Sequence, residues 1–146
     1  NYVATLVSGG EHYAAHLLKS VKSYDNSRLI YNYDEKPLND MNISDSTMAA
    51  VTKGMHDLTH DSLTSAFSRC MVEAGAKTGS AQVGTDIANG VFVAYAPYEG
   101  REIAVAIVGE KGGSGSLLAN AAVDIINAWF SRGSSSVTTG ENTLLQ

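Results

Sequence analysis

The chain has few of the residues that constrain a fold covalently: one cysteine, two prolines and one tryptophan among 146 residues. The single cysteine, Cys70, excludes an internal disulfide and a metal site built from several thiolates, and we predict it as a small buried side chain. The apolar runs are short, with about six residues at 103–108, too few for a bilayer-spanning helix. No basic segment precedes an apolar one in the manner of a secretory signal.

Positive charge is also scarce, since ten Lys and Arg stand against fifteen Asp and Glu, for a net charge of −5. Without a basic stripe to neutralise phosphates, we expect no nucleic-acid partner. Hydrophobic residues make up 44% of the chain and charged residues 17%, which excludes wholesale disorder. The length corresponds to about one domain.

Hydrophobic periodicity and turn residues predict helices and a hairpin in the first half, and three strands followed by a helix in the second. In the first half we expect a helix at 1–7 stopped by Gly9 and Gly10, a hairpin of strands 13–22 and 28–33 around a turn at 24–27, a loop at 34–42, a helix from Ser44 to near Leu58, and a short helix at 63–71. In the second half we expect strands at 76–83, 91–96 and 102–110 and a helix at 117–130. The sequence thus predicts an α/β fold of the α+β type, with three antiparallel strands packed by a C-terminal helix and a small N-terminal hairpin. Residues 1–133 are expected to form the domain segment and residues 134–146 a loose tail.

The sharpest local motif is Lys77-Thr78-Gly79-Ser80, on a predicted strand. Lys-Thr-Gly is a signature of penicillin-binding proteins and class A β-lactamases. A lysine supplies a fixed positive charge for a substrate carboxylate and for proton transfer near a serine. The hydroxyls can bind the same carboxylate, and the glycine lets a substrate backbone approach the strand.

Further strings in the same order extend this likeness over most of the chain, at residues 1–17, 53–55, 76–82, 89–97, 103–110 and 112–115. Together they resemble the transpeptidase domain of class B penicillin-binding proteins, the D,D-transpeptidases that cross-link peptidoglycan. Ala15-His16 stands where that family usually has Pro-His, and Ser80 where it usually has threonine. Ser80 keeps a hydroxyl, so we expect carboxylate binding to survive.

Two motifs of that family are absent from the sequence: the Ser-x-x-Lys that holds its nucleophile, and the Ser-x-Asn. In the family both precede the region matched here. We therefore expect the chain to be the C-terminal part of a transpeptidase domain and to be inactive alone. Its partner would be the N-terminal part of the same domain, and a large exposed apolar patch, or a second chain covering it, should mark where that part sits.

The resemblance implies roles for four residues. Lys77 would help position and protonate groups around the upstream serine, and the backbone N–H of Ser80 would form half of the oxyanion hole. The hydroxyls of Thr78 and Ser80 would face the terminal carboxylate of a stem peptide or a β-lactam, with Gly79 between them. Strict strand alternation puts Lys77 and Ser80 on opposite faces, and an edge strand loosened at Gly79 could present both.

The resemblance also implies a setting: no metal or cofactor, stem peptide and β-lactams as ligands, and a location outside the bacterial cytoplasmic membrane on an N-terminal anchor. The alternative is a non-catalytic, penicillin-binding-like module for scaffolding or ligand sensing. The upstream sequence distinguishes the two, since only the enzyme needs Ser-x-x-Lys and Ser-x-Asn.

Three polar groups carry competing interpretations. His56 and His60 resemble a His-Glu-x-x-His zinc motif with Asp57 in place of glutamate. No third ligand follows at a familiar spacing, and the helix is expected to end near Leu58. We therefore favour solvated histidines at a polar helix end. The glycine-rich residues 109–116 lie where phosphate loops occur but lack their spacing, so we favour a tight turn that lets the last helix pack on the sheet. On that helix we expect Asn120, Asp124 and Asn127 to form a wet face.

Overall fold

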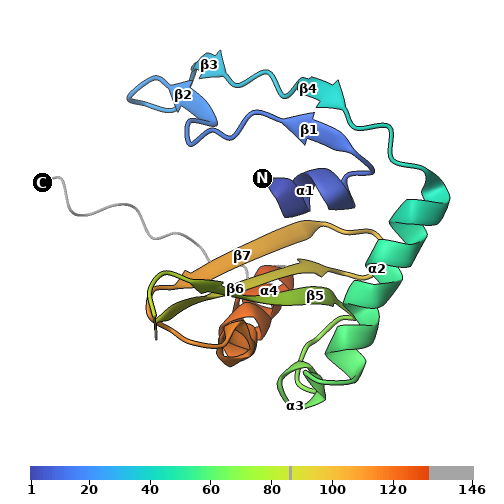
Figure 1. Cartoon of the computed structure of the whole chain (residues 1–146). Helices are drawn as coiled ribbons and strands as arrows, with labels where there is room; N and C mark the ends of the chain where they lie inside the picture. Colours follow the sequence, from blue (N-terminus) through green and yellow to red (C-terminus); the bar gives the residue numbers. More distant parts are fainter. Residues whose placement is uncertain (86, 132–146) are drawn as a thin grey trace, which may run out of the picture.

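The computed structural model describes residues 1–85 and 87–131, so the predicted tail at 134–146 lies outside the described residues. The fold mixes helix and sheet as predicted (Figure 1). In chain order its elements are α1 (Tyr2–Val7), β1 (Glu11–Tyr13), β2 (Ser20–Lys22), β3 (Leu29–Asn32), β4 (Pro37–Asp40), α2 (Asp45–His60), α3 (Thr64–Phe67), β5 (Gly75–Gln82), β6 (Ala88–Ala96), β7 (Ile103–Gly109), the 3-10 turn η1 (Gly115–Leu118) and α4 (Ala119–Ser131).

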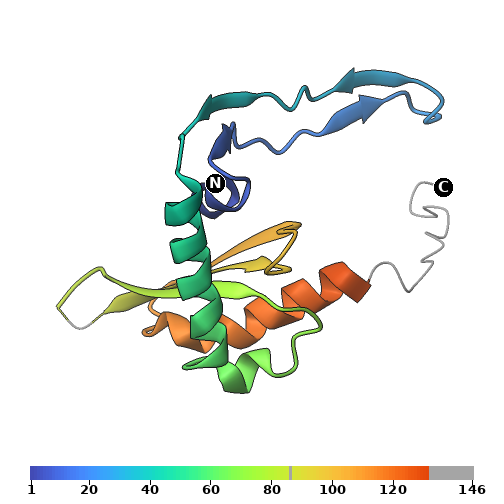
Figure 2. The ribbon, with the colours of Figure 1, turned by 90° about the vertical axis from the view of Figure 1, so that its right-hand side faces the viewer.

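The three predicted strands form one antiparallel sheet in the order β5-β6-β7, which confirms the expected core of the fold. The amphipathic helix α4 covers one face of this sheet, and α1 lies on the other (Figures 1 and 2). α2 runs along the β5 side of the sheet. Among the described residues, β5 is therefore an edge strand flanked by a helix.

Alternation along β6 divides the core into two clusters, one on each face of the sheet. Phe92, Ala94 and Ala96 are fully buried against α3 and α4, with Val123 and Ile126 of the helix opposite them. On the other face, Tyr95 is fully buried among side chains of α1 and α2. Both faces of the central strand are thus apolar, as continuous hydrophobic runs predict.

The start of α2 was predicted well and its end was not. The Ser44 side chain accepts a hydrogen bond from the Thr47 amide, the capping arrangement that the sequence indicated. The helix continues past Leu58 to His60, because its last turn packs against the chain that leads into β5: the buried Thr59 hydroxyl donates to the Ala74 carbonyl oxygen at 3.0 Å. The expected end near Leu58 is wrong by about half a turn.

The N-terminal hairpin is also only partly as predicted. β2 pairs with β3 around the predicted turn, where the Asp25 carboxylate accepts hydrogen bonds from Ser23 and Ser27. These hydrogen bonds lower the pKa of Asp25 to about 2. The stretch expected as one strand at 13–22 is broken, and the expected loop at 34–42 contains β4, which pairs with β1. The four short strands form an elongated arm beyond α1 (Figure 2); such strands are mostly exposed and carry no clear hydrophobic alternation to predict them from.

The glycine-rich turn before α4 acts as predicted, by allowing close packing. A Cβ added at Gly115 would lie 2.2 Å from the carbonyl oxygen of Val91 and 2.4 Å from that of Gly79. Only a glycine permits η1 to rest on the backbones of β5 and β6. The helix that follows begins at Ala119, two residues later than expected, because the first turn is the 3-10 turn η1.

The polar face of α4 is exposed at Asn120 and Asp124, as expected, but its side chains also bind the chain before β5, which the sequence did not indicate. Asn127 accepts a hydrogen bond from the Met71 amide at 2.8 Å and donates to the Arg69 carbonyl at 3.0 Å. Arg69 in turn forms an ion pair with Asp124, which lowers the pKa of that carboxyl, and also donates to the Asn120 carbonyl. These contacts hold the segment between α3 and β5 in place; α3 itself spans only four residues, shorter than the predicted 63–71.

No helix among the described residues is long and apolar enough to cross a membrane.

Candidate active site

The four residues of the predicted site are neighbours on β5 and need no tertiary contact to come together. Their partners on β6 are Val93 for Lys77, Phe92 for Thr78, Val91 for Gly79 and Gly90 for Ser80. The pairing runs through Gly79 without any shift of register. The expected loosening at Gly79 is therefore not observed, and Lys77 and Ser80 leave the strand from opposite faces.

Lys77 lies on the sheet face that carries α1 and α2. Its exposed side chain bends back so that Nζ donates to the Thr78 carbonyl at 2.6 Å. It borders a largely apolar cavity of about 450 Å³ between α1, α2 and the sheet, where Tyr2, Val51 and Val93 are further lining residues. An ammonium group on the rim of an apolar cavity is a suitable partner for an acidic or hydroxyl group brought in by another segment.

Thr78 and Ser80 point toward the opposite face, where Thr78 is half-buried and Ser80 is exposed. Here η1 lies beside the strand, and a Cβ on Gly90, the partner of Ser80, would lie 3.3 Å from the Ser114 carbonyl oxygen. The glycine-rich turn thus packs against β5 at Gly79 and Ser80, while the hydroxyl of Ser80 remains accessible.

The sheet face around Lys77 carries apolar side chains that the described residues leave partly uncovered. Val91 pairs with Val108 and Val93 pairs with Ala106, and all four share the face of Lys77. Val108 is 66% exposed, and Ala106 is also exposed. The large apolar patch that the sequence led us to expect stays a prediction, and these side chains are where it would lie.

Tyr95 closes the same face toward α2. Its ring packs directly over Gly75 at the start of β5, where a Cβ would lie 2.4 Å from the ring, and its hydroxyl donates to the Thr52 carbonyl at 3.2 Å. Burial raises the pKa of Tyr95 to about 12. This contact joins α2 to the sheet beside Gly75, two residues before Lys77.

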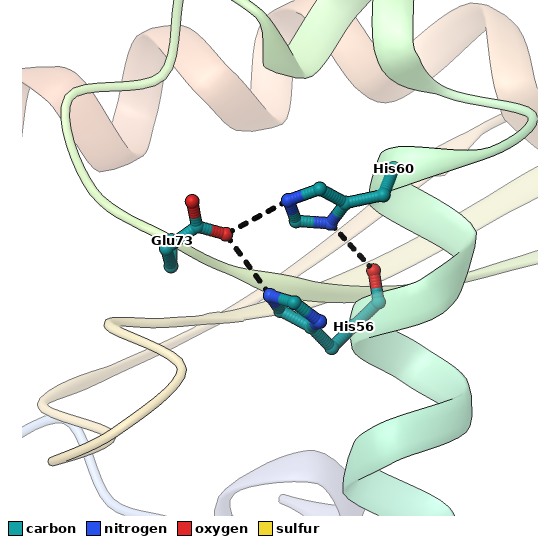
Figure 3. A group of neighbouring side chains, drawn as sticks. All are labelled: His56, His60 and Glu73. Atoms are coloured by element: carbon teal, nitrogen blue, oxygen red, sulfur yellow. Dashed lines mark hydrogen bonds and ion pairs between the residues drawn. The ribbon is translucent and has the colours of Figure 1, made fainter.

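The structure also assembles a group that we did not expect. The two histidines at the end of α2 meet Glu73, which lies just before β5 (Figure 3). His56 Nε2 is 2.9 Å and His60 Nε2 3.0 Å from the same oxygen, Glu73 Oε2. His60 is 52% exposed, as expected for a solvated helix end, but the two histidines are joined through Glu73, which the sequence did not indicate. Sequence reasoning missed Glu73 because its distance from the histidine pair along the chain follows no familiar motif.

Asp57, the residue that resembled the zinc-motif glutamate, faces away from this group. It forms an ion pair with Lys53 at 2.5 Å, one turn earlier on α2, and this contact raises the pKa of Lys53. The His-Asp-x-x-His string is therefore not a catalytic zinc motif of the type that it resembles.

A mixed fold in which a Lys-Thr-Gly strand forms the edge of an antiparallel sheet, with a C-terminal helix behind it, is the arrangement expected of the penicillin-binding proteins whose signature this strand carries. The family model of the penicillin binding protein transpeptidase domain matches residues 1–127. The chain belongs to this family.

Individual relatives agree with this assignment. Penicillin-binding protein 2B of Streptococcus pneumoniae is 32% identical over 120 residues, covering 73% of this chain and 18% of that protein. The solved structure of penicillin-binding protein 2B from strain R6 superposes with a TM-score of 0.73 at 28% identity, covering 90% of this chain and 24% of that one. Penicillin-binding protein A from Mycobacterium tuberculosis, in its imipenem acyl-enzyme complex, gives a TM-score of 0.76 at 25% identity over 87% of this chain and 28% of that one. The chain thus spans about a fifth of the length of the curated relatives that it matches.

Proposed function

We propose that this chain supplies the Lys-Thr-Gly strand of a penicillin-binding D,D-transpeptidase that cross-links peptidoglycan, and that the serine nucleophile belongs to another segment of the same domain. The observation that carries the proposal is the position of Lys77, on an edge strand and beside an uncovered apolar cavity. The presence of an imipenem acyl-enzyme among the similar structures supports it.

In the reaction, the serine oxygen attacks the carbonyl of the D-Ala-D-Ala bond, the terminal D-Ala leaves, and an amine of a second stem peptide takes the acyl group from the serine. A β-lactam acylates the same serine by opening its ring. The chain's contribution is electrostatic: Lys77 supplies positive charge beside the serine, and the Ser80 amide donates to the oxyanion. Removal of one such oxyanion donor costs about 3–4 kcal/mol in acyl transfer. The hydroxyls of Thr78 and Ser80 bind the substrate carboxylate, with Gly79 leaving room for the substrate backbone.

The segment that carries the serine is proposed to sit in the cavity between α1, α2 and the open sheet face. The lining is mostly apolar, so an amphipathic helix suits it, and Lys77 stands at its rim where a polar residue of that helix would meet the ammonium. In this arrangement the serine approaches β5 on the face that carries Lys77, and the substrate carboxylate binds at the edge of the strand. It therefore reconciles the unbroken alternation of β5 with a single active site.

Labelling with fluorescent penicillin, read on a denaturing gel, tests the proposal. The isolated chain should remain unlabelled, and the protein of native length should be labelled. In the latter, Lys77→Ala should slow labelling about 10²- to 10⁴-fold, the range for removal of a group that assists proton transfer. Lys36→Ala is the matched control, because Lys36 is an exposed lysine of the arm that pairs with Asp34.

Labelling of the isolated chain would contradict the proposal, since it would require a nucleophile within these residues. Labelling of the Lys77→Ala protein at the rate of the Lys36→Ala protein would remove Lys77 from the mechanism. A protein of native length that takes no label at all would favour the non-catalytic module. On the enzyme proposal, the domain acts outside the bacterial cytoplasmic membrane, where peptidoglycan is assembled, and a membrane anchor elsewhere in the protein holds it there.

A further inference from the structure

We propose that His56, His60 and Glu73 form a binding site for a divalent transition-metal ion, with Zn²⁺ as the ion that their chemistry fits. This inference replaces the expectation of no metal and does not depend on the transpeptidase proposal. The ligand atoms are two imidazole nitrogens and one carboxylate oxygen, all within 4.8 Å of one another. Zinc sites with three protein ligands use this kind of set and leave one position open.

The histidines are placed by helix geometry. Residues four apart lie on the same side of a helix, one turn above the other, and the two rings are 4.2 Å apart between centroids. The extension of α2 to His60 is what creates this pair, since a helix ending near Leu58 would not aim both rings the same way. Both Nε2 atoms then converge on a single carboxylate oxygen (Figure 3).

The second nitrogen of His60 is already occupied. His60 Nδ1 lies 3.1 Å from the carbonyl oxygen of His56. A carbonyl oxygen only accepts hydrogen bonds, so Nδ1 carries the hydrogen and Nε2 presents the site toward Glu73. Metal-ligating histidines almost always show this pattern, in which the other ring N–H donates to a carbonyl or carboxylate and fixes the ring.

The backbone that carries Glu73 is held in place without help from a metal. The hydrogen bond from Thr59 to the Ala74 carbonyl fixes the chain just after Glu73, and the Glu73 carbonyl accepts from the Tyr98 amide at 2.6 Å. The ring of Tyr98 also packs against His56, with centroids 4.1 Å apart. The site is therefore built by three parts of the chain that pack together: the end of α2, the segment before β5 and the β6–β7 turn.

The three side chains are accessible to an ion from solvent, and a cavity beside them leaves room for a fourth ligand. The His56 side chain is 24% exposed, whereas those of His60 and Glu73 are 52% and 64% exposed. A cavity of about 350 Å³ borders His60 and Glu73 and also reaches Cys70. Water can fill the fourth position from this side. Asp57 is engaged by Lys53, so this carboxylate is not available as a general base beside the ion, and the role we infer is to join two parts of the chain.

A bound ion would fasten the end of α2 to the segment that leads into β5. Glu73 precedes Lys77 by only four residues, so the ion would stabilise the strand that carries the candidate active site. Binding to the folded chain alone raises its stability in proportion to the logarithm of the free metal concentration. The expected result is a thermal midpoint that rises with Zn²⁺ and returns when the metal is chelated.

The test is Zn²⁺ titration by calorimetry on the protein of native length, with three ligand variants and two controls. His56→Ala, His60→Ala and Glu73→Gln should each lower the affinity by at least tenfold, since loss of even an outer partner of a metal ligand costs about 10- to 100-fold. His16→Ala and Asp57→Asn should bind as the wild type does. His16 stacks on Tyr33 in the arm, and Asp57 is the carboxylate of the same helix turn that points elsewhere.

A second readout needs no variant and so does not depend on whether the variants fold. In the wild-type protein, Zn²⁺ should shift the side-chain ¹⁵N resonances of His56 and His60 at Nε2 and leave those of His12 and His16 unchanged. Absence of such shifts, or equal affinity in the ligand variants and the controls, would overturn the proposal. The group would then be a set of polar contacts between the two histidines and Glu73 and nothing more.

Discussion

Gly115→Ala tests how the glycine-rich turn supports the active-site strand. The added Cβ would lie 2.2 Å from the Val91 carbonyl oxygen and 2.4 Å from that of Gly79. An ordinary contact is about 1 Å longer, and both atoms belong to the backbone of paired strands, so no side chain can turn aside. Overpacking of this kind typically costs about 1–3 kcal/mol. We expect a loss near 3 kcal/mol in the free energy of unfolding.

The Gly115→Ala substitution should lower the rate of acylation as well as the free energy of unfolding. A displacement of about 1 Å in η1 or β5 would move the rim at Gly79 and Ser80, and a misplacement of that size can cost about 10²-fold in rate. Urea unfolding gives the first quantity, and the rate of fluorescent-penicillin labelling of the native-length protein gives the second.

Gly84→Ala is the matched control, because a Cβ there meets nothing within 4 Å. The Gly115→Ala protein should be less stable than this control by more than 2 kcal/mol on the estimate above. Equal stability of the two variants would refute the reasoning, since it would mean that η1 does not rest on the strands. Reduced stability with an unchanged labelling rate would separate the turn's structural role from any role at the site.

Two further predictions concern the core and its supports. Asn127→Ala should cost about 1–3 kcal/mol in urea unfolding, because it removes two hydrogen bonds to the backbone that contribute about 0.5–1.5 kcal/mol each. Asp124→Ala should cost less, because its ion pair is exposed, and equal losses in the two variants would show that the ion pair holds the segment. Folding raises the pKa of the Tyr95 hydroxyl from 10.0 to about 12. As the pH rises, the unfolded chain therefore loses the Tyr95 proton before the folded chain does, and the free energy of unfolding should fall between about pH 10 and about pH 12. Tyr95→Phe should remove that part of the alkaline slope, and an unchanged slope would show that the ring is not buried.

The sequence was most informative where neighbouring residues carry the signal. The strands at β5, β6 and β7 were predictable because long apolar runs bounded by turns have few alternatives, and the family motifs along them are contiguous. The N-cap at Ser44 and the close-packed turn at Gly115 follow from single residues with specific backbone roles. The candidate site residues at Lys77 and Ser80 belong to this class, although their roles stay predictions.

Prediction failed where distant contacts override local pattern. The arm strands β1 and β4 are separated by more than twenty residues and are held by backbone pairing, which leaves no hydrophobic signature. The hydrogen bonds made by the polar residues of α4 were not predicted, because nothing local shows that the chain before β5 returns to bind them.

The sequence by itself determined the family, the three-stranded sheet and the position of the Lys-Thr-Gly strand, since each depends on order and spacing along one stretch of chain. Only the tertiary structure decided that β5 keeps its alternation through Gly79, that an uncovered apolar face lies beside Lys77, and that Glu73 meets His56 and His60. The physical reason is the same in each case. These properties depend on how helices pack against a sheet, and residues far apart in sequence become neighbours only after that packing has formed.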